Sequence, residues 1–425
     1  MVRQAYRYAL RPNAGQRRAL ARHVAFARRV FNWGLSYCKD RYASGEKHPT
    51  HFDLCKAYVR WRNEGGPLPG RDVGDSRWDS EARKLRRLDA RCSSATYLGS
   101  LRNVSTAYKN FFRGLKASRR VGFPRFKGRR ARKSFYLKGG IRAEGRSMRL
   151  PTFGSISTHE KTRPKGRIEA ATISLESDGR WYVMLRVERD RQRPGPRLRG
   201  RVGVDLGISC FAVLSTGERI EHPRPYKEAE RRLAQLSRVM SRRVRGSAGH
   251  RKAVKAVAKC HARVAAIRKD FLHTLTTRLA KEHSEVVVED LSVWGLMRTK
   301  RRGLAKAVGD QGWGTFRIQL AYKTEWYGGR LVVADRFYPS TKRCSACGVV
   351  GPKVPLDVRV FKCAACGYTA DRDLNAARNL EQYCESTATQ AGFEAGGGDG
   401  KTVGGRAGAR RRQPQGNRKR VVYAR

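Results

Sequence analysis

Two spacings of apolar residues alternate along the N-terminal half and predict a mixture of strands and helices. The segment YRYAL (6–10) alternates as a short strand does, and residues 16–37 carry apolar side chains at helical spacing. Helix-like segments continue to about residue 117. Residues 168–188 consist of two alternating runs joined by Ser-Asp-Gly, which predicts a β-hairpin.

The C-terminal half has a different pattern, in which short apolar runs end in an acid or a turn. It follows a Pro-rich, charged segment, 190–200, that is typical of a domain boundary. The strand-like runs are 200–208, 210–214, 286–290 and 331–335. Between the second and the third, residues 226–283 have the pattern of a helical hairpin that is broken at 245–250.

The charge of the chain indicates a polyanionic partner. Lys and Arg number 92 against 36 Asp and Glu, which gives a formal net charge of +56 over 425 residues. Such a chain repels itself unless a polyanion neutralises it, and nucleic acid is the obvious counter-charge. A ribosome-type or merely soluble basic protein is the alternative. The Gly- and Arg-rich tail, 385–425, has too few large apolar residues to fold and is expected to be disordered.

No targeting or membrane segment is apparent in the sequence. No apolar run approaches the roughly 18 residues needed to span a bilayer. The N-terminus lacks the apolar region of a secretory signal. We therefore expect a cytoplasmic protein.

One stretch combines basic and aromatic residues in a way that suits RNA. Residues 113–142 are rich in Lys and Arg and contain no acid, while Phe and Tyr are interleaved with them. Basic side chains contact phosphates and aromatic rings stack on bases, so we expect a nucleic-acid contact surface here. The alternative is a solvated basic loop whose aromatic rings anchor it to the core. The candidate contact residues are Arg125, Lys127, Arg129, Arg130, Arg132, Lys133 and Tyr136.

Four of the ten cysteines have the spacing of a zinc site. Cys344, Cys347, Cys363 and Cys366 form the pattern C-x2-C-x15-C-x2-C, and a glycine follows each pair. Four thiolates in two knuckles are the tetrahedral ligand set that structural zinc prefers, and they leave no open position for catalysis. A redox dithiol pair or an iron–sulfur site is the alternative. The other six cysteines are scattered, which is typical of a reduced compartment.

Acidic residues stand at the ends of several predicted elements. Asp205 lies within a strand-like run, Glu289 ends another, and Asp371 and Asp373 open a helix-like segment at 370–380. Singly, each has an ordinary explanation as a turn, ion-pair or N-cap residue. Together, in so basic a chain, carboxylates are what two divalent ions need to clamp the attacking and leaving oxygens of a phosphodiester. Hard oxygen ligands favour magnesium or manganese over zinc.

Several segments form a recognisable set in this order along the chain: YRYALRPNAGQ, FNWGL, GFPRFKGRRARKSFYL, VGVDLGI, RKDFLHTLTTRLA, VVVEDL, WGTFRIQLAYKTEWYGG, FYPSTKRCSACG and CAACGYTADRDLNAARNL. With these segments the chain resembles the TnpB (OrfB-type) proteins of bacterial insertion sequences, over roughly residues 3–383. Proteins of that family are RNA-guided DNA nucleases related to the type V CRISPR effectors.

The resemblance implies an α/β multidomain fold. An RNase H-like (RuvC-type) nuclease domain would span 200–383 and contain a zinc ribbon at 340–369. A wedge-like β-barrel, formed by 1–12 and 120–195, would be interrupted by a helical recognition lobe at 13–119.

The resemblance also implies roles for individual residues. Asp205, Glu289 and Asp373 would hold two magnesium (or manganese) ions, one activating a water and the other stabilising the departing 3′ oxygen. Asp371 is the alternative to Asp373. Nothing in the resemblance gives a metal to the other two acids that end apolar runs, Asp290 and Asp335.

The implied function is metal-dependent cleavage of DNA beside a short transposon-adjacent motif, directed by a guide RNA. The implied partners are the guide RNA, double-stranded target DNA and the transposase of the same mobile element, with nucleoid association in a bacterial cytoplasm when DNA is bound. Base pairing between guide and target would select the sequence.

Three other functions stay open. A guided DNA-binding repressor that cuts little is disfavoured by the presence of all three acids. A transposase or junction resolvase that needs no RNA is disfavoured by the basic stretch and by the resemblance outside the nuclease core. A basic zinc-ribbon protein of a ribonucleoprotein leaves the acids unexplained.

Overall fold

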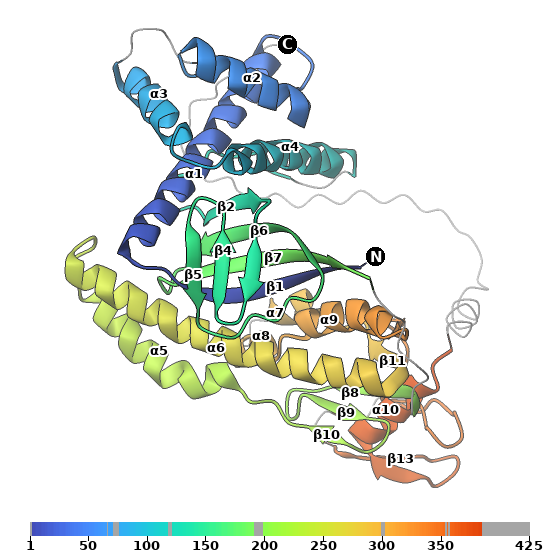
Figure 1. Cartoon of the computed structure of the whole chain (residues 1–425). Coiled ribbons are helices and arrows are strands. Elements are labelled where there is room, and N and C mark those ends of the chain that lie inside the picture. Colours follow the sequence, from blue (N-terminus) through green and yellow to red (C-terminus); the bar gives the residue numbers. More distant parts are fainter. Residues whose placement is uncertain are drawn as a thin grey trace, which may run out of the picture.

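The protein has a mixed α/β fold in which two larger sheets occupy separate regions, each with helices beside it (Figure 1). The computed structural model describes residues 2–65, 67–70, 76–117, 121–190, 199–298, 302–352, 355 and 358–384. The tail that the sequence predicts to be disordered, 385–425, lies outside the described residues, as does most of the predicted linker.

The first large sheet is antiparallel and has the strand order β2-β6-β7-β1-β5-β4-β3. Its strands are β1 (Val2–Arg11), β2 (Lys133–Lys138), β3 (Arg142–Glu144), β4 (Ser147–Leu150), β5 (Gly154–Thr158), β6 (Arg167–Leu175) and β7 (Trp181–Arg189). The hairpin predicted at 168–188 is confirmed as β6–β7. β1 is longer than the predicted 6–10 because it pairs with β7 from Val2 to Leu10, in the middle of the sheet.

Four helices, which lie together at one end of the molecule in Figure 1, interrupt this sheet in the sequence. They are α1 (Ala14–Ala43), α2 (His51–Glu64), α3 (Ser76–Asp89) and α4 (Ser94–Lys116). α1 starts before the predicted 16–37 because Asn13 and Gln16 form a capping box. Leu20 packs in the core of the sheet, whereas Phe26 and Val30 pack among the helices, so α1 belongs to both cores.

The C-terminal half, residues 199–384, is built on a five-stranded sheet of order β10-β9-β8-β11-β12. Its strands are β8 (Arg199–Leu206), β9 (Ala212–Leu214), β10 (Arg219–Ile220), β11 (His283–Glu289) and β12 (Arg330–Ala334). β8, β9 and β10 form an antiparallel meander, and β8, β11 and β12 are parallel. The strand-like runs of the C-terminal half therefore belong to one sheet.

Helices cover both faces of this sheet. They are α5 (Pro225–Ser241), α6 (Ala248–Glu282), α7 (Val293–Met297), α8 (Arg302–Gln311), α9 (Trp313–Trp326) and α10 (Arg372–Glu381). Side chains of α6 and α9 pack on one face with Val204 and Val288, and α10 packs on the other with Val287. The predicted helical hairpin is confirmed as α5–α6. Among the described residues, no helix is long and apolar enough to cross a membrane.

α10 lies against β8 with no space for a side chain between them. A Cβ atom added at Gly203 would lie 1.9 Å from the carbonyl oxygen of Ala377 and 2.5 Å from the amide nitrogen of Glu381. Both atoms belong to the backbone of α10, so neither can turn away. Gly203 is therefore required for α10 to lie where it does.

We predict that Gly203→Ala destabilises the protein by at least about 2 kcal/mol, because α10 must move away from the sheet. The control is Gly200→Ala in the same strand, where an added Cβ meets no atom within 4 Å; its effect should stay within about 0.5 kcal/mol. Urea unfolding of both variants measures the difference. Equal effects of the two substitutions would contradict the close contact.

Candidate active site and metal centre

Two of the predicted acids lie side by side at the end of the sheet. Asp205 belongs to β8, and Glu289 is the last residue of β11. The two strands are parallel neighbours, and Val204 lies opposite Val288. Asp205 and Glu289, the next residues of the two strands, therefore lie beside each other. The structure thus brings together acids that are 84 positions apart in the sequence.

The third acid, Asp373, reaches the same place on α10. Side chains alternate along a strand, so Asp205 points to the same face of the sheet as Gly203, two residues earlier. Gly203 touches Ala377 of α10. Asp373 lies four residues before Ala377, which is about one helical turn on the same helix face. α10 therefore carries Asp373 to the face from which Asp205 projects.

The electrostatics of the two strand carboxylates reflect this arrangement. Burial, and then the negative charges of Glu289 and Asp373, raise the pKa of Asp205 well above its usual range, while Arg372 opposes the shift. Burial also raises the pKa of Glu289, and a hydrogen bond from the Ser340 hydroxyl opposes it. Buried carboxylates whose neighbours are negative are stabilised in their ionised form by a bound cation, which fits a divalent metal.

The carboxylates form a wider group than the cysteines do. Among the residues that the structure describes, only the four cysteines form a group of three or more His, Cys, Asp or Glu ligand atoms compact enough to hold a metal ion. Asp205, Glu289 and Asp373 do not form so compact a group in the described part of the chain.

Three other acids near the ends of these elements, Asp371, Asp335 and Asp290, form hydrogen bonds or ion pairs with other residues. The Asp371 carboxylate caps α10 by accepting hydrogen bonds from the amides of Asp373 and Leu374, at 3.1 and 3.0 Å, and it forms an ion pair with Arg219 at 2.6 Å. Asp335 accepts a hydrogen bond from the amide of Phe337 at 2.8 Å. Asp290 forms ion pairs with Arg317 and Arg336. These contacts favour Asp373 over Asp371 as the third ligand.

The sequence analysis did not identify three residues that link α10 to the acids and the cysteines. Asn375 and Asn379 are fully buried and face the loop before the first cysteine pair. Asn375 accepts a hydrogen bond from the Ser345 amide at 2.9 Å, and Asn379 donates one to the Ser340 carbonyl at 2.7 Å. The Ser340 hydroxyl donates to Glu289. The spacing of the two asparagines, four residues apart in a helix-like run, is the signal that could have shown that they share one helix face.

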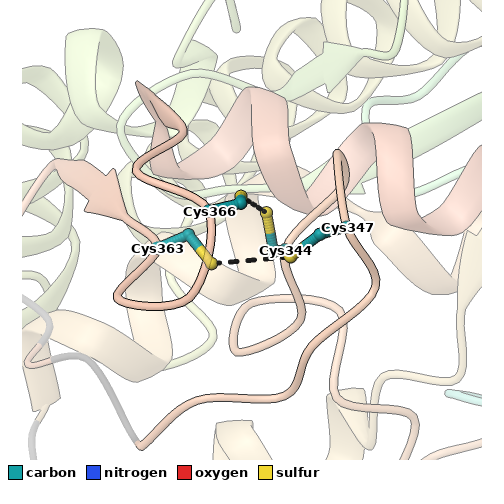
Figure 2. Close-up of side chains that lie close together, drawn as sticks. All are labelled: Cys344, Cys347, Cys363 and Cys366. Carbon is teal, nitrogen blue, oxygen red and sulfur yellow. Dashed lines mark hydrogen bonds between the residues drawn. The ribbon is translucent and has the colours of Figure 1, made fainter.

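The four cysteines converge from two loops that have the same backbone geometry (Figure 2). In each loop a glycine with positive φ, Gly348 or Gly367, donates its amide to the carbonyl of the first cysteine of the pair. The Sγ–Sγ distances are 3.7 Å between Cys344 and Cys366 and 3.6 Å between Cys347 and Cys363.

Those distances match a tetrahedral zinc site. Zn–S bonds of about 2.3 Å place the sulfur atoms of a tetrahedron about 3.8 Å apart. Hydrogen bonds from the backbone amides of Cys366 and Ala365 lower the pKa of the Cys363 thiol to about 7, whereas the neighbouring sulfur atoms raise the pKa of Cys366 to about 12 against the effect of the Tyr368 amide. The distances, rather than these pKa values, support a metal site. The small sheet of β13 (Val360–Lys362) and β14 (Thr369–Asp371) connects this cluster to α10.

The predicted nucleic-acid contacts do not all face solvent. Five are exposed: Arg125, Arg129, Arg130, Arg132 and Lys133. Lys127 is half-buried, with its amide bonded to Asn32 and its ammonium 3.7 Å from the centroid of the Phe31 ring. Tyr136 is half-buried against α4, where Gly99 lies beside its ring. The anchoring of an aromatic ring to the core fits Tyr136, and the role of all seven residues in nucleic-acid contact stays a prediction.

Three family models match segments of the chain. One described as "Probable transposase" (OrfB_IS605) matches residues 184–300, and one described as "Cas12f1-like, TNB domain" matches residues 313–380. A third, described as "Helix-turn-helix domain", matches residues 1–47, which here form β1 and the long helix α1.

Relatives match nearly the whole chain. It is 34% identical over 384 residues, 89% of each chain, to a protein of Streptomyces pristinaespiralis named as an RNA-guided DNA endonuclease. It is 30% identical to the similarly named InsQ of Escherichia coli (strain K12), over 89% of this chain and 91% of that one. A solved Cas12f1 complex with sgRNA and target DNA is similar over 89% of this chain and 98% of that one, with a TM-score of 0.48 and 12% identity.

The fold and the site define a mixed α/β protein with acids at adjacent strand ends and a four-cysteine cluster that could hold a metal ion. The chain belongs to the TnpB (OrfB-type) family.

The cysteine cluster predicts one zinc ion per chain, measured by metal analysis of the purified protein. Cys363→Ser should lower the zinc content strongly, because a serine hydroxyl does not replace a thiolate ligand. The control is Cys260→Ser on α6, outside the cluster, which should leave the zinc content unchanged. Iron in place of zinc, or equal zinc in both variants, would contradict the assignment.

The raised pKa of Asp205 predicts a gain in stability when its charge is removed. In magnesium-free buffer, the stability of Asp205→Asn relative to the wild type should increase as the pH rises, because asparagine carries no charge to ionise beside Glu289 and Asp373. Since the folded protein holds the proton more tightly than the unfolded chain, the wild type should also lose stability as the pH rises from the usual carboxyl pKa towards the raised one.

Thermal unfolding at several pH values measures both effects. Asp335→Asn, an exposed acid at the end of the neighbouring strand, is the control and should show no gain. Added magnesium should stabilise the wild type more than Asp205→Asn. Destabilisation by Asp205→Asn, with no difference in the magnesium effect, would count against a cation site.

Proposed function

We propose that this protein is a metal-dependent endonuclease of an insertion sequence that cleaves DNA under the direction of a guide RNA. What carries the proposal is the pairing of β8 with β11 beside the contact of α10 at Gly203, together with the effect of the Glu289 and Asp373 charges on the pKa of Asp205. It occurs in a chain whose relatives of similar length are named as RNA-guided DNA endonucleases. The formal charge of +56 suits a protein that binds two nucleic acids at once.

The three proposed metal ligands are held by different elements and have different neighbours. When bound, two magnesium or manganese ions supply an activated water and a counter-charge for the departing 3′ oxygen. Asp205 and Glu289 offer carboxylates from adjacent rigid strands, and Ser340 orients Glu289 through its hydroxyl. Asp373 lies 3.7 Å from both Arg359 and Arg372, which moderate the negative charge when no cation is present.

For residues 200–383 we propose an RNase H-like (RuvC-type) nuclease domain. The sheet has an antiparallel meander of three strands followed by two parallel strands, with helices on both faces, and this topology supports the proposal. The zinc ribbon within it, at 340–369, would be structural, since four thiolates fill a tetrahedral site.

For the N-terminal half we propose a wedge-like β-barrel of residues 1–12 and 120–195 that holds a helical recognition lobe, 13–119. The pairing of β1 with β7 and β5, across the inserted helices, supports one β domain. Buried side chains of α1 to α4 form a hydrophobic core among the helices, and this core supports a helical lobe as a separate part. These two parts would bind the guide RNA, the guide–target duplex and the transposon-adjacent motif, with the exposed arginines near β2 among the contacts.

The first test is purification of the protein with its flanking DNA present in the cell, followed by sequencing of the RNA that accompanies it. We expect one dominant RNA that maps beside the gene and ends in a variable segment. That RNA should direct cleavage of a matching DNA in magnesium. Heterogeneous RNA, or none at low salt, would contradict guidance by RNA and favour a resolvase-like enzyme.

Asp205→Ala should lower the cleavage rate at least about 100-fold and leave guide-dependent DNA binding intact, because it removes a metal ligand and not a nucleic-acid contact. Asp335→Asn, the exposed acid at the end of β12, is the matched control and should cleave normally. Cleavage by the wild type as slow as by Asp205→Ala, with tight binding by both, would instead support a guided repressor.

A further inference from the structure

Glu289 has the most flexible side chain of the three proposed metal ligands. It has one more rotatable bond than Asp205 or Asp373, and it is the last residue of β11. A metal site needs its ligands held to within about 0.5 Å of their positions in the complex. The orientation of the Glu289 carboxylate must therefore be set by a neighbouring group.

The neighbour that the structure provides is Ser340, whose hydroxyl donates a hydrogen bond to Oε1 of Glu289. Ser340 is buried and belongs to the irregular segment between β12 and the first cysteine pair. Within that segment, the Ser340 amide donates to the Tyr338 carbonyl at 2.9 Å. A hydroxyl on such a segment orients a carboxylate only if the segment itself is held in place.

Asn379 of α10 holds this segment. Its fully buried Nδ2 group donates to the Ser340 carbonyl at 2.7 Å and to the Arg343 carbonyl at 2.6 Å. Carbonyl oxygens only accept, so the amide must point its nitrogen towards them. Its Oδ1 atom is buried and has no hydrogen-bond partner in the described part of the chain. A buried acceptor without a partner is unfavourable for stability, which indicates that the two donors of Asn379 are what matters.

We propose that Asn379 is a positioning residue for the Glu289 carboxylate and that it acts through Ser340. The Asn379 amide fixes the backbone of Ser340, and the Ser340 hydroxyl then orients Glu289 towards the cation site. α10 serves this site twice, because it carries Asp373 as a proposed ligand and Asn379 as the anchor of Ser340. The inference rests on the proposed function, since Glu289 needs a fixed orientation only if it binds a cation.

The test measures the affinity of the full chain for manganese alone, from the electron paramagnetic resonance signal of the free ion. Manganese that binds to the wild type but not to Asp205→Asn defines the carboxylate site. Ser340→Ala should weaken this binding about tenfold, the usual loss when the hydrogen-bond partner of a metal ligand is removed. Asn379→Ala should weaken it at least about threefold, because it acts one step further from the ligand. If the alanine variant does not fold, Asn379→Ser, which keeps one donor, takes its place.

The control is Gln382→Ala on the same helix. Gln382 also donates its side-chain amide to the cysteine-bearing segment, but it does so at the Ser345 carbonyl, 3.0 Å away. A residue that only anchors this segment should behave like Gln382, so Gln382→Ala should leave the manganese affinity unchanged. Zinc content and thermal unfolding, measured for every variant, show whether the cysteine cluster and the fold remain intact.

A double variant tests whether Asn379 acts through Ser340. If it does, the protein with both Ser340→Ala and Asn379→Ala should bind manganese about as weakly as Ser340→Ala alone, because the first substitution already breaks the connection. Losses that multiply in the double variant would overturn the proposal. It would also be overturned by an unchanged affinity in either single variant, or by an equal loss in Gln382→Ala.

The same measurements separate this inference from the proposed function. If the wild type binds no manganese that depends on Asp205, the proposed metal-dependent function and the role of Asn379 fail together. If Asp205-dependent binding and guided cleavage of DNA are present but Ser340→Ala and Asn379→Ala do not change the manganese affinity, the proposed function stands and only the role of Asn379 fails.

Discussion

The backbone contact between β8 and α10 at Gly203 is the constraint on which the arrangement of the C-terminal half depends. With no side chain at this position, the carbonyl of Ala377 comes to the surface of the sheet. Asp205, two residues after Gly203, lies on the same face of the strand as Gly203. Asp373, four residues before Ala377, lies on the same face of the helix as Ala377. The convergence of the acids is therefore a consequence of packing, and a residue without chemistry of its own determines it.

A second set of contacts connects this helix to the cysteine cluster. Asn375 and Asn379 on α10 bond to the backbone around the first cysteine pair, and Ser340, in the same loop, bonds to Glu289. The buried amides are fully enclosed, so loosening the loop would leave their polar groups unsatisfied at a cost of about 1–3 kcal/mol each. The loop that carries the first cysteine pair, α10 and Glu289 are thus parts of one hydrogen-bonded unit.

The sequence predicted the elements and residues whose signals are local. Alternation identified the β6–β7 hairpin, helical spacing identified α5–α6, and the C-x2-C spacing identified four cysteines that do lie together. The sequence did not predict features that depend on distant contacts. The length of β1 depends on its pairing with β7, and the need for Gly203 depends on a helix about 170 positions later. Lys127 is half-buried over the Phe31 ring, and its burial was not predicted because no local pattern shows which side of a loop meets the core; its contact with nucleic acid stays a prediction.

The central claim is that Asp205, Glu289 and Asp373 together hold divalent cations. The most direct measurement is a crystal structure of the guide-bound protein in manganese, with anomalous scattering used to locate the ions. The account predicts two manganese peaks about 4 Å apart, bounded by these three carboxylates. Peaks bound by Asp371 or Asp290 instead, or no peak beside Asp205 at saturating manganese, would contradict it.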